Sequence, residues 1–458
     1  LLWGGLFALL RRADQPRQAA LTGFAFGLGF FLTGVSWVYV SLSVFGGMPW
    51  WLAGTAAVLF CAALALHPAL AAWLFRRYLP RHFWQQALYF ACLIALSDWF
   101  RSWLFTGFPW LALGYSQAPP SPLAGFAPVL GVFGLSLLTA LIGALLLNWR
   151  SGLAALVIGG LGGGLLQQVS WTQASGAPIT VALIQGNIPQ EMKFRPEAFL
   201  RTLILYRDLV AEHPATLTLL PETAFPAFID QLPPDYLAEL QDFARRQNGD
   251  LLFGALSGDI AGQYFNSAIS LGQAPTQIYS KQHLVPFGEF IPPGFAWFMA
   301  QAHIPVSAFS RGRSEQAPLH IAGQKIAVNI CYEDVFGEEL APAAAQAGLL
   351  ANLSNTAWFG HSLAQPQHLQ IAQMRALETG RPMLRATNTG MTAIVNHDGH
   401  IQAALPAFTT DVLQAEVQGR DGQTPYLLWR NWAFLLLAIS GLILSQWRRQ
   451  AEKSAHPQ

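Results

Sequence analysis

The first part of the chain is a series of long apolar runs separated by short polar loops. Five runs have the length that an α-helix needs to cross about 30 Å of hydrocarbon; they cover residues 19–40, 50–75, 83–105, 123–147 and 153–168. An incomplete run covers residues 1–10, and since the chain begins inside it at Leu1, we expect part of the natural N-terminus to be missing. A further run follows at residues 427–444. The pattern predicts a multi-pass α-helical membrane bundle.

The charges between these runs predict how the chain is oriented. Loops that carry arginine alternate with uncharged loops near residues 46 and 114–120, and the basic loops contain Arg11, Arg12, Arg17, Arg76, Arg77, Arg81 and Arg150. Positively charged loops stay in the cytoplasm, so everything after about residue 168 is predicted to lie outside the cytoplasmic membrane. The last run is followed by Arg448, Arg449 and Lys453, which predicts a cytoplasmic tail over residues 448–458.

Between residues 171 and 425 the pattern becomes that of a soluble α/β domain. Short β-rich runs occur at residues 179–188, 216–220, 251–256, 267–271, 325–330, 349–354 and 391–396. Helical patterns lie between several of them, at residues 196–212 behind Pro196 and at residues 367–379 before Gly380. We therefore expect membrane helices in residues 1–170, the α/β domain in 171–425, a last membrane helix in 426–447 and the tail.

Composition agrees with a membrane protein and excludes other classes. Hydrophobic residues make up 53% of the chain and charged residues 11%, which is far from an ordinary soluble composition. The formal net charge of +1 offers no excess of Lys and Arg for nucleic acid. Three cysteines are too few for a disulfide-rich scaffold. His, Cys and acidic residues nowhere show metal-ligand spacing, so we predict no metal, and nothing points to a cofactor.

Cys331 is the cysteine best placed for nucleophilic chemistry. It follows the apolar run 325–330 and precedes a helix expected from about Val335, so it occupies a sharp strand-to-helix turn. The helix N-terminus is expected to favour the thiolate. Cys61 and Cys92 lie within apolar helices, where a thiol acts as a small apolar group. Taken alone, Cys331 is as consistent with an ordinary buried cysteine as with a nucleophile.

A thiol nucleophile needs a base and a donor for its oxyanion, and two other strand ends offer them. Glu222 follows the run 216–220 in LLPET, and Lys281 follows a β-rich stretch in YSKQHLVPFGE. A Glu or Lys at a strand end is usually a solvated loop residue. Their occurrence together with Cys331 nevertheless predicts a catalytic site.

Four motifs in this order, LLPET, KQHLVPFGEF, NICYED and SNTAWFG, resemble the signatures of the apolipoprotein N-acyltransferases, the membrane-bound branch of the nitrilase superfamily. The resemblance extends to WVYVSLSVFGGMP and TGFPWLALGYSQ in the membrane part, and thus to nearly the whole chain. It implies a nitrilase-like α-β-β-α sandwich. It also implies that Glu222 is the general base, Lys281 the oxyanion-stabilising cation and Cys331 the acylated nucleophile.

The same resemblance implies a set of supporting residues. Glu289 in PFGE matches a second glutamate that orients the lysine and the reacting amine. Tyr332 and Glu333 match positions that the family needs, and the backbone N–H of Tyr332 sits where a second oxyanion donor belongs. Phe194 and Trp358 are expected to bind substrate through their aromatic surfaces.

Two residues depart from the family pattern, and two charged residues lie close together on one membrane helix. Phe194 stands where a tryptophan is common, and Thr356 stands where an aspartate is usual, which leaves the role of that position open. Asp98 and Arg101 lie three residues apart on one membrane helix, which predicts a structural ion pair, with lipid headgroup binding as the alternative.

The substrates follow from the resemblance alone. They are a phospholipid acyl donor and a lipoprotein whose N-terminal cysteine carries a diacylglyceryl group, used in ping-pong order by a monomer of the bacterial inner membrane with its catalytic domain in the periplasm. Two rivals remain. A membrane-tethered amidase would use the same three residues but would not need the membrane motifs. A non-catalytic multipass lipid-binding protein or transporter would not need the three residues together.

Overall fold

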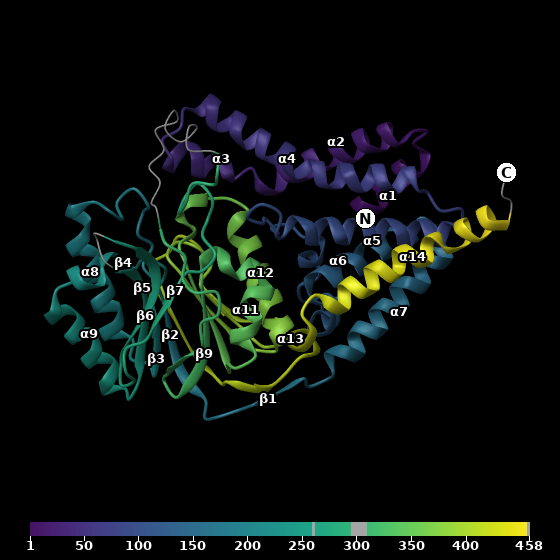
Figure 1. Cartoon of the computed structure of the whole chain (residues 1–458). Coiled ribbons are helices and arrows are strands. Elements are labelled where there is room, and N and C mark those ends of the chain that lie inside the picture. The colour runs from purple at the N-terminus through teal and green to yellow at the C-terminus, as the bar shows by residue number, and fades with distance from the viewer. Residues whose placement is uncertain (259–261, 295–308, 456–458) are drawn as a thin grey trace. The chain divides into compact units, whose positions relative to one another are not determined.

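The computed structural model describes residues 1–258, 262–294 and 309–455, with side chains up to residue 447, and it divides into two compact units (Figure 1). One unit contains Leu1–Ser36, Gly54–Ser170 and the chain from Leu428 on; the other contains Trp37–Ala53 and Trp171–Leu427. The predicted tail cations Arg448, Arg449 and Lys453 have side chains outside the described residues.

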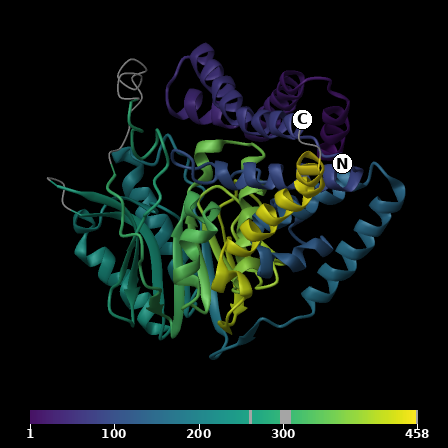
Figure 2. The same cartoon turned by 45° about the vertical axis from the view of Figure 1, so that its right-hand side comes forward.

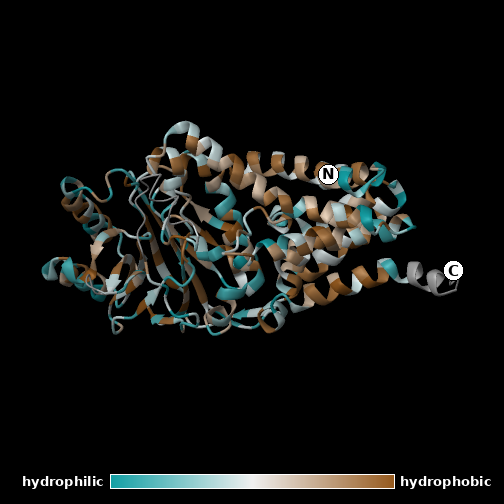
Figure 3. Cartoon of the chain, turned by 45° about the horizontal axis from the view of Figure 1, so that its top comes forward, coloured by the Kyte–Doolittle hydropathy of each residue, from teal (hydrophilic) through white to brown (hydrophobic). Residues whose placement is uncertain are grey.

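The first unit is a bundle of apolar helices, whose hydrophobic residues appear brown in Figure 3. Its helices are α1 (Leu2–Arg12), α2 (Pro16–Val35), α4 (Trp50–Arg77), α5 (Phe83–Arg101), α6 (Ala127–Leu145), α7 (Trp149–Gln167) and α14 (Trp432–Ala455), with the short α13 (Pro425–Trp429) before α14. By length and composition, four stretches of the described chain can cross a membrane: Pro16–Val35, Trp50–Arg77, Pro122–Leu145 and Trp149–Gln167. Helix α5 and the apolar part of α14, Trp432–Trp447, fall outside this set.

Helix α5 ends at Arg101 rather than near residue 105, because its last turn holds the following loop. Asp98 Oδ1 accepts from the Arg101 guanidinium at 3.0 Å, and Oδ2 accepts from Leu113 N at 2.8 Å and Ser136 Oγ at 2.9 Å. Arg101 also donates to the carbonyl of Trp110 at 2.7 Å. Both members of the pair are buried and use partners within this unit. The pair is therefore structural, and the headgroup alternative loses its support.

The second unit contains two mixed β-sheets. The order of the first is β14-β2-β3-β5-β6-β7 with β4 paired to β5, and that of the second is β13-β12-β11-β10-β9-β8. The strands of the first are β14 (Asp411–Val417), β2 (Ile179–Gln185), β3 (Leu217–Leu219), β4 (Phe225–Phe228), β5 (Asp250–Gly258), β6 (Tyr264–Gly272) and β7 (Ile278–Ser280). Those of the second are β13 (Ile401–Ala404), β12 (Ala393–Val395), β11 (Met383–Thr387), β10 (Leu349–Ser354), β9 (Gln324–Ile330) and β8 (Leu319–Ile321). A small separate pair joins β1 (Thr172–Ala174) to β15 (Arg420–Gly422).

Apolar side chains place these sheets face to face between two helical layers. One buried cluster takes residues from both sheets, such as Val181 and Leu183 of β2 with Val328 of β9. Helices α8 (Pro196–Glu212) and α9 (Pro234–Arg246) pack on the first sheet, and α11 (Gly337–Ala344) and α12 (Ala364–Thr379) pack on the second. The arrangement, visible in Figure 2, confirms the predicted α-β-β-α sandwich.

In this unit one strand was not predicted from the sequence, and one helix begins about two residues later than expected, each for an identifiable reason. The buried strand β11 was missed because Arg385 interrupts its apolar pattern, and this arginine is accommodated by pairing with Asp334 at 3.3 Å. The helix expected from Val335 begins at Gly337, because Cys331–Val335 forms a 3-10 turn (η5) first.

The segment between α2 and α4 belongs to the second unit. It contains α3 (Val38–Val40) and a π-helix, η1 (Ser41–Phe45), and so α2 ends at Val35 rather than near residue 40. The Trp37 ring packs on Phe359 at 4.5 Å, and Ser41 Oγ donates to the carbonyl of Trp358 at 2.8 Å. The segment is thereby attached to η6 (Thr356–Phe359), the turn after β10.

Candidate active site

Cys331 lies on a strained turn directly after β9. Its φ of +53° is in the left-handed region, which costs a residue with a Cβ about 1–2 kcal/mol, and its side chain is buried. Asn352 Nδ2 donates to the Cys331 carbonyl at 3.1 Å and so holds the turn from β10. The predicted strand-to-helix position of the thiol is confirmed.

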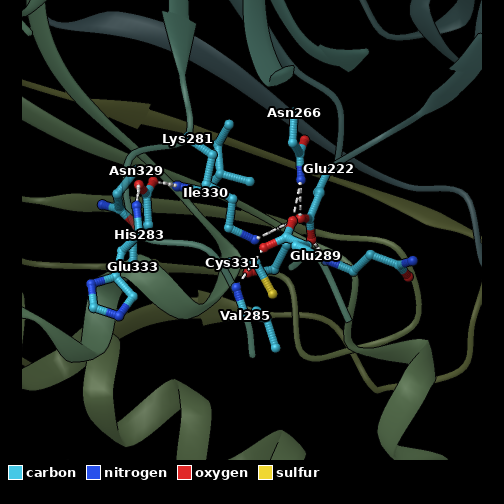
Figure 4. Close-up of polar contacts among 12 residues, drawn as sticks. Glu222, Asn266, Lys281, His283, Val285, Glu289, Asn329, Ile330, Cys331 and Glu333 are labelled. Carbon is cyan, nitrogen blue, oxygen red and sulfur yellow. Dashed lines mark hydrogen bonds and ion pairs between the residues drawn. The ribbon is translucent and has the colours of Figure 1, made fainter. Parts of the chain in front are cut away.

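Glu222, Lys281 and Glu289 form one hydrogen-bonded cluster beside this turn (Figure 4). Lys281 Nζ lies 3.3 Å from Glu222 Oε1 and 2.9 Å from Glu289 Oε1, and its side chain is 1% exposed. Asn266 on β6 joins the two carboxylates, because its Nδ2 donates to Glu222 Oε1 at 2.7 Å and to Glu289 Oε1 at 3.0 Å. Asn355 N donates to Glu222 Oε2 at 2.9 Å. The structure thus brings the strand ends of Glu222 and Lys281 together beside the Cys331 turn, and Glu289, which the family resemblance indicated, joins them.

Burial and neighbouring charges set the protonation states of this cluster. Burial alone would raise the pKa of Glu222, but the ammonium groups of Lys281 and Lys193 outweigh it and hold that pKa below its usual value. The pKa of Lys281 is raised, because Glu222 and Glu289 outweigh the burial that would lower it. Glu222 is therefore an ionised acceptor and Lys281 a cation at neutral pH.

The expectation that a helix N-terminus favours the Cys331 thiolate is wrong. Burial raises the pKa of the Cys331 thiol, the Glu222 carboxylate raises it further, and Lys281 opposes both. The thiol is therefore protonated at neutral pH, and it can act as a nucleophile only when a base takes its proton. The Glu222 carboxylate beside this turn is ionised and so has the protonation state that a base requires.

Glu333 connects the Cys331 turn to the loop that follows Lys281. Its Oε1 accepts from the backbone N–H groups of Gln282 at 2.7 Å and His283 at 3.0 Å, and its Oε2 accepts from Ile330 N at 2.6 Å and Tyr279 Oη at 2.9 Å. Burial raises its pKa to about 7, against the opposing effects of Lys281 and of these N–H groups. This geometry supplies a physical role for a residue that the sequence marked by its motif alone.

The other predicted residues lie around this cluster rather than in it. The Tyr332 ring packs against His283 and Phe336. Phe194 is exposed and lines a cavity of about 280 Å³ with Lys193 among its other walls. Trp358 is 40% exposed and meets the Phe45 ring at 5.9 Å.

Thr356 is fully buried at the start of η6, the turn that also carries Trp358. Among the residues that the structure describes, its hydroxyl oxygen has no hydrogen-bond partner. Nothing in the structure explains the exchange of the usual aspartate for threonine.

A buried polar network beneath the turn was missed by sequence reasoning. Asp334 Oδ1 accepts from His368 Nε2 at 2.8 Å, while Arg385 NH1 lies 3.3 Å from Asp334 Oδ2 and donates to Asn352 Oδ1 at 2.7 Å. Asn352 also donates to the Cys331 carbonyl, so hydrogen bonds link this network to the turn that carries the thiol. Asp334 stands in the motif NICYED, so the motif contained a signal for it.

Comparisons with known proteins agree with both units. Residues 1–145 match the family model for the apolipoprotein N-acyltransferase N-terminal domain, and residues 180–426 match that for carbon-nitrogen hydrolases. The chain is 52% identical over 454 residues to the apolipoprotein N-acyltransferase of Nitrosomonas europaea, covering 96% of this chain and 90% of that protein. It is 45% identical over 467 residues to that of Ralstonia nicotianae, covering 98% and 89%.

A solved structure, an amidase of the nitrilase superfamily from Nesterenkonia AN1, is 20% identical, with a TM-score of 0.41 over 57% of this chain and 97% of that one. Among the described residues, no three His, Cys, Asp or Glu side chains are grouped to hold a metal ion. The matches to both family models and the full-length relatives show that this chain belongs to the apolipoprotein N-acyltransferase family.

Proposed function

We propose that this protein transfers an acyl chain from a phospholipid, through a thioester on Cys331, to the α-amino group of diacylglyceryl-modified lipoproteins. The observation that carries the proposal is the buried cluster of Glu222, Lys281 and Glu289 beside a thiol that needs a base. Acyl transfer through a thioester requires a nucleophile, a base and a cation at one point, and Cys331 together with this cluster offers all three.

In the first half-reaction Glu222 takes the thiol proton as Cys331 attacks the ester carbonyl of the phospholipid. The negative charge that develops on the carbonyl oxygen is stabilised by Lys281 and by the backbone N–H of Tyr332. The C–O bond of the ester then breaks, and protonated Glu222 returns its proton to the departing lysophospholipid alkoxide. A thioester remains, and Glu222 is ionised again.

In the second half-reaction the neutral α-amine of the acceptor attacks the thioester carbonyl. Glu222 accepts a proton from the amine, the C–S bond breaks, and the thiolate is reprotonated as the amide is released. Asn266 contributes here, because its Oδ1 is buried and has no hydrogen-bond partner among the described residues, so that it can accept from the second N–H of the amine. Glu289 holds both Asn266 and Lys281 in place.

Chain connectivity supports a membrane-proximal location for this chemistry. The segment from Trp37 to Phe45 links two stretches long enough to cross a membrane, and it packs on Trp358 and Phe359 of η6. The Asn355 N–H, at the start of η6, binds the Glu222 carboxylate. A site so close to a membrane loop suits substrates that stay in the bilayer, and the exposed Phe194 and Trp358 rings suit acyl chains.

The alternation of basic and uncharged loops supports a periplasmic catalytic domain in a bacterial inner membrane. In this proposal residues 1–170 form the membrane part, residues 171–425 the periplasmic domain, residues 426–447 a last membrane helix and residues 448–458 a cytoplasmic tail. The site is complete within one chain, which suits a monomer.

The test uses the full chain purified in detergent, with phospholipid and a diacylglyceryl peptide. We expect mass spectrometry to find an acyl group on Cys331 before acceptor is added and an N-acylated peptide afterwards. Cys331→Ser should trap no thioester and lose turnover, because an alcohol is a poorer nucleophile with this base, whereas the matched control Cys61→Ser should keep both. Release of ammonia from small amides without acyl transfer would support the amidase instead, and neither activity would leave the non-catalytic alternative.

A further inference from the structure

Lys193 is a second buried cation near the nucleophile, and no motif pointed to it. It lies in the loop between β2 and α8, and its side chain is 3% exposed. Its Nζ donates to the main-chain carbonyl of Glu222 at 3.0 Å, the one hydrogen bond that it makes to the described residues. An ammonium group is rarely buried with so few partners unless nearby negative charge stabilises it.

The charges around Cys331 show why a second cation is needed. Glu222 and Glu289 carry two negative charges, and Lys281 carries one positive charge between them. When Glu222 takes the thiol proton, the negative charge of its carboxylate is replaced by a negative charge on the sulfur. The total charge of this buried site therefore does not change. Lys193 brings a second positive charge, so that these four groups sum to zero rather than to one net negative charge; the Glu333 carboxylate, the further acidic group at the turn, has its own backbone N–H donors from Gln282, His283 and Ile330. Burial lowers the pKa of Lys193 to about 8, against the opposing effects of the negative charges of Glu222 and Cys331.

We propose that Lys193 is a positioning residue of the acyl-transfer site, which fixes the Glu222 main chain and supplies the second positive charge that lets the Cys331 thiolate form. The acyl-transfer part of this statement rests on the proposed function, whereas the effect on the thiol does not. Lys193 touches Glu222 rather than the reacting atoms, so it acts through its neighbours.

Loss of the Lys193 charge should change the reactivity of Cys331 in a predictable direction. The charged groups that Lys193 faces are Glu222 and Cys331, with Lys281 and Glu289 behind them, whereas Glu191, Arg195 and Glu197 of its own segment are exposed to solvent. Replacing Lys193 by methionine keeps an unbranched side chain and removes the positive charge. The thiolate then becomes harder to form, so that any reaction of Cys331 that needs it moves to higher pH.

The experiment measures alkylation of Cys331 by iodoacetamide between pH 6 and 10 in the full chain, followed by mass spectrometry of the Cys331 peptide. We expect Lys193→Met to alkylate with a rate constant about tenfold lower at neutral pH, and this difference should shrink as the pH rises through about 8, where Lys193 itself loses its proton. Lys193→Arg should return the rate constant at neutral pH toward that of the unmodified protein. The control Lys325→Met removes an exposed lysine at the far end of the strand before Cys331 and should change nothing.

Two results would overturn the proposal. The first is an unchanged alkylation rate constant at neutral pH in Lys193→Met, even if acyl transfer falls, because a purely structural role would lower the fraction of protein that can be alkylated without changing the rate constant. The second is a loss of rate that Lys193→Arg leaves unrestored, because charge would then not be the cause. Since alkylation needs no lipid, a lower alkylation rate constant in Lys193→Met, found for a protein that transfers no acyl chain, would reject the proposed function and leave the effect of Lys193 on the thiol standing.

Discussion

Glu333→Gln tests whether the site depends on the connection between the Cys331 turn and the Lys281 loop. The carboxylate accepts four hydrogen bonds, three of them from backbone N–H groups. A glutamine has one acceptor oxygen. Its NH2 group would take the position of Oε1 or Oε2 and would face the donors that now bind that oxygen. With the NH2 group at the Oε1 position, the N–H groups of Gln282 and His283 both lose their acceptor. With the NH2 group at the Oε2 position, the Ile330 N–H loses its acceptor, while the Tyr279 hydroxyl can turn and accept. At about 1–3 kcal/mol for each buried donor left without an acceptor, the change should cost about 1–6 kcal/mol.

Part of this cost should appear as displacement of Lys281, because Gln282 and His283 directly follow it. A misplacement of about 1 Å at a catalytic group can lower a rate by about 100-fold. We expect Glu333→Gln to lower the rate of acyl-enzyme formation by this order and to lower the unfolding temperature of the domain. Single-turnover mass spectrometry measures the first quantity and calorimetry in detergent the second. The control Glu338→Gln, at an exposed position on α11, should match the unmodified protein in both.

One outcome would refute this account of Glu333. If Glu333→Gln forms the acyl-enzyme at the unmodified rate and unfolds at the unmodified temperature, the four hydrogen bonds do not hold the site. If the variant unfolds at the unmodified temperature but forms the acyl-enzyme slowly, the positioning role of Glu333 stands. The effect of the substitution then lies in the displacement of the Lys281 loop.

Three further predictions follow from the same geometry. Glu333 accepts four hydrogen bonds only when ionised and has a pKa of about 7, so acyl-enzyme formation should decline as the pH falls through 7. Glu222 stays ionised at this pH and does not cause the decline. A single-turnover pH profile of Glu333→Gln should therefore lack it. Gly254→Ala should lower acyl-enzyme formation by about 100-fold, because its Cβ would lie 2.7 Å from Glu222 Cα and 2.3 Å from Thr223 N; Gly164→Ala, where a Cβ meets nothing within 4 Å, is the control. Asn266→Ala should slow transfer to the amine more than thioester formation, which separate measurement of the two half-reactions would show; equal slowing would contradict its role with the amine.

Much of the site could be predicted from the sequence because its groups lie within a few residues after strand ends. Glu222, Lys281 and Cys331 come after β3, β7 and β9, and short apolar runs that end in a polar residue mark such positions. That these ends meet at one point was not visible in the runs themselves. It follows from the pairing of β6 with β7 and from the packing of the two sheets face to face.

The missed residues share a different property. Asn266 lies within strand β6, Lys193 lies in a loop, and Arg385 lies in the middle of a strand, where each looks like an isolated polar residue. Their partners are far away in the chain: Asn266 contacts Glu222, Lys193 contacts the Glu222 carbonyl, and Arg385 pairs with Asp334. A local pattern cannot reveal a partner that only the tertiary fold brings close.

By itself the sequence determined the apolar helices, the α/β domain and the order of the catalytic motifs, since length, periodicity and residue type are local properties. The tertiary structure alone decided the protonation of the site. The helix N-terminus predicted a favoured thiolate, yet burial and the Glu222 carboxylate raise the pKa of Cys331 and leave it in need of a base. Burial and the distances between charges depend on the whole fold, and so the state of the nucleophile emerges only when the chain is folded.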